Sequence, residues 1–184
     1  EFGADGTVVS ASGDTIELSM AAFEPAEDVA ARIEELRGPI AELTATPVTE
    51  LAAPIDGSRD NCRARECGMG NTVADAMLAR VSGLGATIAL ANGGGLRASL
   101  QEGTITLGDV LTALPFQNKL FTMELQGSVI VAALEHGVNG VEEAQGRFPQ
   151  VAGLRFRLDV SVPPNGGGCR VGRCRAPLAP AATC

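Results

Sequence analysis

The order of hydrophobic and polar positions along the chain predicts several short strands. Residues 86–91 (ATIALA) form a nearly continuous apolar run, which is typical of a fully buried strand. In residues 154–158, leucine and phenylalanine alternate with arginine, which predicts a strand with one exposed face. We also expect a strand over residues 119–125. A small hairpin is predicted in which residues 7–10 and 15–18 flank a Ser-Gly-Asp turn.

Other segments place apolar residues at helical spacing, and we expect helices at residues 29–36, 72–81, 107–114 and 128–136. Asn71 is the candidate N-cap of the second helix, and Thr106 with Asp109 forms a candidate capping box before the third. The pair Gly38-Pro39 interrupts the first helix, and Pro115 ends the third. After Val162 the composition shifts to Pro, Gly, Arg, Cys and Ala, which predicts a loop or hairpin.

Composition narrows the class of protein. With 184 residues, of which 45% are hydrophobic, the chain suits one domain with a sizeable core plus an appendage. It contains no uninterrupted apolar stretch of about 18 residues, so we expect no transmembrane helix. Its first residues are charged and include no apolar leader, as expected of a mature or partial chain. The net charge of −8 makes nucleic acid an unexpected partner, because binding to phosphate backbones requires a basic face.

A glycine turn follows the apolar run and carries the first candidate chemistry. Asn92, the glycines at 93–95 and Arg97 come directly after the predicted strand. Glycine lets the backbone approach a ligand closely, and a guanidinium offers a planar fork of donors to phosphate or carboxylate. The motif is not a P-loop, since no Lys-Ser/Thr pair follows. By itself it is also compatible with a simple strand-to-helix turn.

The five cysteines indicate an oxidising compartment. Cys62 and Cys67 enclose four residues, and Cys169 and Cys174 have the same spacing, while Cys184 is left over. This spacing permits a zinc site and favours two disulfides.

Five motifs together resemble the C-terminal, substrate-binding domain of the 5'-nucleotidase family, in particular the secreted ecto-5'-nucleotidase type. They lie in family order at residues 55–71, 92–97, 103–118, 134–138 and 146–159. The resemblance implies an α/β fold with mixed sheet layers, like the 5'-nucleotidase C-terminal domain. It implies that residues 1–45 are the tail of an N-terminal metallophosphatase domain with a linker helix. The C-terminal-type domain then covers residues 46–162, and residues 163–184 form a Pro/Gly/Cys-rich loop segment.

The same resemblance assigns the candidate substrate-binding residues. Arg63 and Arg97 are expected to contact phosphate or ribose, Asn92 the base or sugar, and Phe116 the face of the base, with Gly94 in the turn between them. It also implies a disulfide between Cys62 and Cys67. Because so short a loop gains little stability from closure, we expect this disulfide mainly to fix the direction of Arg63, and we expect Cys169 to pair with Cys174.

The chemistry of hydrolysis is missing from this sequence. A two-metal phosphatase site needs several His and Asp ligands, and the chain contains a single histidine, His136, at the end of a predicted helix. We therefore expect no catalytic residue and no metal ligand here. The resemblance places the divalent metals, with zinc expected, in the N-terminal domain. The family pattern also continues to a segment of the type NxFxxxGGDG(F/Y), which closes over the base and holds the ribose, and this sequence ends before it.

The sequence thus predicts the substrate-binding domain of a secreted 5'-nucleotidase. It would position a nucleoside monophosphate such as AMP for metal-dependent hydrolysis by a separate N-terminal metallophosphatase domain, and this chain alone would be inactive. An extracellular, cell-surface or periplasmic location follows from the cysteines. The alternative is a non-catalytic binding or assembly module that retains the fold without the metal domain.

Overall fold

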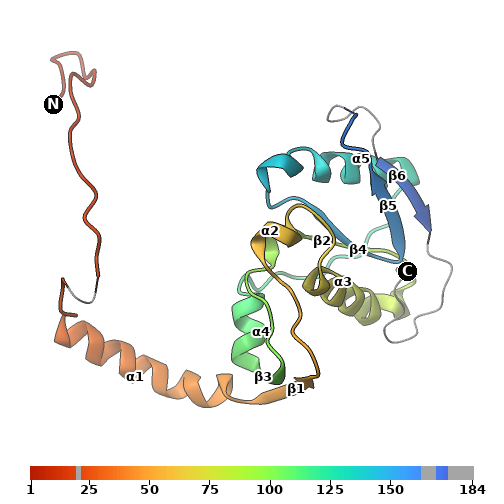
Figure 1. Ribbon diagram of the computed structural model, residues 1–184, viewed down its shortest axis with the longest axis horizontal. Coiled ribbons are helices and arrows are strands. Elements are labelled where there is room, and N and C mark those ends of the chain that lie inside the picture. Colours follow the sequence, from red (N-terminus) through yellow and green to blue (C-terminus); the bar gives the residue numbers. More distant parts are fainter. Residues whose placement is uncertain (20–21, 163–168, 174–184) are drawn as a thin grey trace. The chain divides into compact units, whose positions relative to one another are not determined.

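The computed structural model describes residues 1–19, 22–162 and 169–173 (Figure 1). Contacts between Cα atoms divide the chain into two units, Glu1–Glu42 and Leu43–Cys184. In the first unit the predicted hairpin is wrong, because residues 7–10 and 15–18 form no paired strands and only an isolated bridge joins Phe2 to Val8. The apolar residues there are exposed rather than packed on a core, and a lone hairpin is marginal in water.

Helix α1 spans Glu27–Thr44 and continues through Pro39. The predicted interruption at Gly38-Pro39 is therefore wrong. No residue of α1 is buried, so water can bond to the carbonyl that proline leaves without its helical donor.

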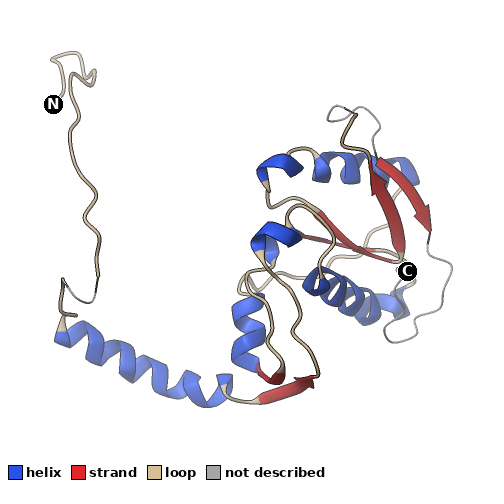
Figure 2. Cartoon of the chain, viewed as in Figure 1, coloured by secondary structure: helices blue, strands red, loops and turns tan. Residues whose placement is uncertain are grey.

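The second unit combines helices with small antiparallel sheets, which confirms the predicted fold class (Figure 2). The strands pair as β1 (Pro47–Leu51) with β3 (Gly103–Thr106), β2 (Ala89–Asn92) with β4 (Pro149–Ala152), and β5 (Leu154–Leu158) with β6 (Cys169–Arg173). The α-helices are α2 (Arg59–Cys62), α3 (Gly68–Val81), α4 (Leu107–Ala113) and α5 (Gly127–Val138), and the 3-10 turns are η1 (Ser82–Leu84), η2 (Gly93–Gly95) and η3 (Val141–Glu143).

The β2–β4 pair lies between α3 and α5 (Figure 1). Small side chains, among them Ala74, Ala89 and Ala152, let α3 pack closely on this pair. On the other side Leu134 of α5 packs with Phe148 in a second cluster. Core packing on both sides therefore positions β2 and β4. It also positions the glycine turn that follows β2 and the segment that precedes β4.

Three local predictions are wrong for identifiable reasons. The strand expected at residues 86–91 forms only as β2, and Leu90 is exposed where full burial was expected. Asn71 does not cap α3: Cys67 does, and its Sγ accepts a hydrogen bond from the Gly70 amide at 3.2 Å. Residues 119–125 have a strand-like pattern but no strand in the described part of the chain pairs with them.

Other local predictions are confirmed. Thr106 and Asp109 form a reciprocal capping box at the start of α4, and this helix ends just before Pro115. Helix α5 covers the predicted residues 128–136, and β5 alternates in burial as expected. No helix among the described residues is long and apolar enough to cross a membrane.

Candidate functional site

A disulfide-closed loop forms one side of the site. Cys62, the last residue of α2, is bonded to Cys67, with 5.2 Å between their Cα atoms. Both cysteines are buried with Met69, Leu96 and Ala113. The loop is thus anchored in the core at both ends, and Arg63 emerges directly after its first anchor. The other predicted pairing involves Cys174, which lies outside the described residues.

The glycine turn forms the floor of the site. The amide of Gly94 donates to the Gly146 carbonyl at 2.8 Å, and Asn92 Nδ2 donates to the same carbonyl at 3.1 Å. A Cβ on Gly94 would lie 2.7 Å from that oxygen, so the two backbones meet at a distance that only glycine permits. The Oδ1 atom of Asn92 remains available to accept a hydrogen bond.

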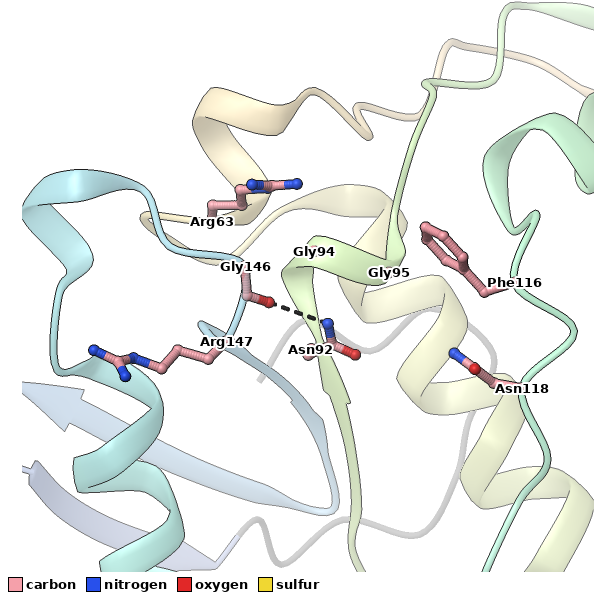
Figure 3. A pocket seen from close by; sticks show the side chains of 8 residues that line it. All are labelled: Arg63, Asn92, Gly94, Gly95, Phe116, Asn118, Gly146 and Arg147. Atoms are coloured by element: carbon pink, nitrogen blue, oxygen red, sulfur yellow. Dashed lines mark hydrogen bonds between the residues drawn. The ribbon is translucent and has the colours of Figure 1, made fainter. Parts of the chain in front are cut away.

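The disulfide loop and the glycine turn border an open groove with a volume of about 580 Å³ (Figure 3). Phe116 stands beside the glycine turn with 55% of its surface exposed. The groove is lined by Arg63, Asn92, Gly94, Gly95, Phe116, Asn118, Gly146 and Arg147. A ligand in this groove would therefore meet an aromatic face, an amide oxygen and guanidinium groups.

Positive charge converges on the groove. Arg63 Nε is buried and has no hydrogen-bond partner. Burial lowers the pKa of the Arg63 guanidinium, and repulsion by Arg59 and Arg97 lowers it further. An anionic or oxygen-rich ligand in the groove would offset this repulsion.

The structure brings most of the predicted residues together. Arg63, Asn92, Gly94 and Phe116 all line the groove, whereas Arg97 does not. Arg97 instead places its Cζ 5.7 Å from the centre of the Phe116 ring, a cation–π distance. Two polar lining residues, Asn118 and Arg147, were not predicted, although both lie within motifs that carry the family resemblance.

No cluster among the described residues fits a metal ion. His136 lies exposed in the last turn of α5, and no group of three His, Cys, Asp or Glu side chains converges in the part of the chain that the structure describes.

Comparisons with known proteins agree on one family. The family model "5'-nucleotidase, C-terminal domain" matches residues 39–183. The bovine 5'-nucleotidase is 32% identical over 174 residues, covering 89% of this chain and 30% of its own. The trifunctional nucleotide phosphoesterase protein YfkN of Bacillus subtilis is 45% identical over 111 residues, covering 60% of this chain and 8% of its own.

Among solved structures, the 5'-nucleotidase precursor from Thermus thermophilus superimposes with a TM-score of 0.74 at 38% identity. That match covers 93% of this chain and 34% of the other. The chain thus spans about a third or less of the length of these relatives.

Proposed function

Because the chain belongs to the 5'-nucleotidase C-terminal domain family, we propose that its groove binds a nucleoside monophosphate such as AMP and presents it to a separate N-terminal metallophosphatase domain. The observation that carries this proposal is the exposed Phe116 ring facing the same groove as Arg63, whose buried Nε has no partner. A flat aromatic face beside an unsatisfied cation matches a base joined to a sugar phosphate.

The residues predicted for the site then have separate tasks. Phe116 stacks on the base, while Arg97 over the ring restrains it and adds a cation–π contribution. Arg63 donates to an oxygen of the phosphate or ribose. Asn92 accepts through Oδ1, since its Nδ2 is already bonded to Gly146. Gly94 keeps the floor of the groove free of side chains. The hydrolytic metals, with zinc expected, belong to the N-terminal domain.

The disulfide supports an oxidising location for the protein, either outside the cell or in a periplasm. The alternative of a non-catalytic assembly module is not favoured, since the relatives are nucleotidases and nucleotide phosphoesterases.

A titration with AMP followed by NMR tests the binding. We expect the signals of Arg63, Asn92 and Phe116 to shift together, because all three line one groove. Adenosine and inorganic phosphate, titrated separately, show which half of the nucleotide each residue senses. If AMP leaves these signals unchanged, or shifts only residues outside the groove, the proposed function is wrong.

A second expected result is that this chain alone releases no phosphate from AMP in the presence of zinc, manganese or magnesium. The reason is that its described residues provide no metal site. A phosphate assay on homogeneous protein measures this. Turnover that persists through purification and disappears in an Arg97→Ala variant would contradict it.

A further inference from the structure

Gln150 is a buried polar residue behind the groove rather than in it. It is the second residue of β4 and only 1% of its surface is exposed. In the pairing of β2 with β4 it lies opposite Ala91, and the next pair joins Asn92 to Pro149. Gln150 is therefore fixed to the same ladder that places Asn92 at the groove.

The carboxamide of Gln150 holds the disulfide loop through three backbone groups. Its Nε2 donates to the carbonyl of Cys62 at 3.0 Å and to that of Arg65 at 2.8 Å. Its Oε1 accepts from the Cys67 amide at 3.4 Å. One side chain thus bonds to both ends and the middle of the loop that carries Arg63, and at the buried residues Cys62 and Cys67 it satisfies backbone groups that water reaches poorly.

Backbone segments pack closely around Gln150. A Cβ on Gly70 would lie 2.1 Å from Gln150 Oε1, so α3 begins directly against the carboxamide. The Cys62 carbonyl that Gln150 binds also lies against Gly93, where a Cβ would come within 1.9 Å of it. The loop, the glycine turn and β4 therefore meet closely around Gln150.

The Arg63 Nε is buried without a hydrogen-bond partner, so no hydrogen bond at this atom fixes the side chain. The backbone of the loop therefore contributes to where Arg63 points. The disulfide joins the two ends of that loop but does not fix the peptide planes between them.

We propose that Gln150 is a positioning residue for Arg63, which it aims into the groove by holding the backbone on both sides of it. This inference rests on the proposed function, because it gives Gln150 a role in nucleotide binding that it performs without touching the nucleotide.

The first test needs no ligand and uses the Arg Nε–H signals of the full chain. A Gln150→Met variant keeps the volume and removes all three hydrogen bonds. We expect the Arg63 Nε–H to gain mobility in ¹⁵N relaxation and to exchange faster with solvent. Arg147 is the internal control, since its Nε donates to the Asn139 carbonyl away from this loop, and its signal should not change.

The outcomes of this test are distinct. An unchanged Arg63 signal, or an equal change at Arg147, would show that Gln150 has only a general structural role and would overturn the inference. If the Met variant does not fold, Gln150→Asn provides the same comparison, because it keeps the carboxamide but moves it by one methylene.

The second test is a double-mutant cycle on the AMP dissociation constant. We expect Gln150→Met to weaken binding about tenfold and to add almost nothing to Arg63→Ala, because both changes remove the same contact. With Phe116→Ala the losses should multiply instead. Multiplying losses with Arg63→Ala would overturn the inference. If the unmodified chain does not bind AMP, the proposed function fails, while the Arg63 mobility still decides the role of Gln150.

Discussion

Replacing Gly93 with alanine should lower the free energy of unfolding by about 3 kcal/mol, the upper range for forcing an extra methyl group into a packed interior. The new Cβ would lie 1.9 Å from the Cys62 carbonyl oxygen and 2.8 Å from its carbon. Both are backbone atoms in a buried, disulfide-anchored residue, so no side-chain rotation can relieve the overlap. Urea unfolding of both proteins measures the difference.

Gly83→Ala is the matched control. Gly83 lies in η1, and no atom stands within 4 Å of the position that its Cβ would take. This variant should be as stable as the original chain or slightly more so, because alanine reduces the freedom of the unfolded state. Equal losses in the two variants would contradict the close approach of the glycine turn to the loop.

The parts of the fold that depend on neighbouring residues could be predicted from the sequence. The capping box of Thr106 and Asp109 is formed within one helical turn, so the sequence pattern of these residues is sufficient to predict it. The alternation of β5 likewise reflects a local pattern. Such features need no knowledge of what lies across the domain.

The errors arose where a distant partner decides the outcome. Residues 119–125 alternate like a strand, yet a strand exists only when another pairs with it. Asn71 is a good capping residue, but the disulfide fixes Cys67 one turn earlier and α3 begins there. The missing strand partner is a property of the whole fold, whereas the Cys62–Cys67 disulfide was expected, but its effect on the start of α3 was not predicted from it.

The candidate site also contains residues that could be predicted from the sequence and residues that could not. The family resemblance identified Arg63, Asn92, Gly94 and Phe116, which the structure places around one groove. It did not separate Arg97, which contacts the ring, from the lining residues. Gln150 lies within a motif that carries the resemblance, but its role could not be predicted, because it depends on the loop that its carboxamide binds.

Replacing Phe116 with alanine should weaken AMP binding by about 1 to 3 kcal/mol, the usual contribution of one aromatic side chain stacked on a base. That corresponds to a loss of roughly 5-fold to 150-fold in affinity. The ring is already 55% exposed, so its removal leaves little cavity and the fold should survive. Titration by NMR measures both the affinity and the integrity of the domain.

Phe121→Ala is the control that separates stacking from a general loss of apolar surface. Phe121 is 81% exposed and does not line the groove, so its removal should leave the affinity unchanged. Phe116→Leu refines the test, since leucine keeps apolar contact but has no flat face and should bind nearly as weakly as alanine. If Phe116→Ala and Phe121→Ala bind AMP equally well, the base does not stack on Phe116, and the groove recognises the nucleotide through its sugar and phosphate alone.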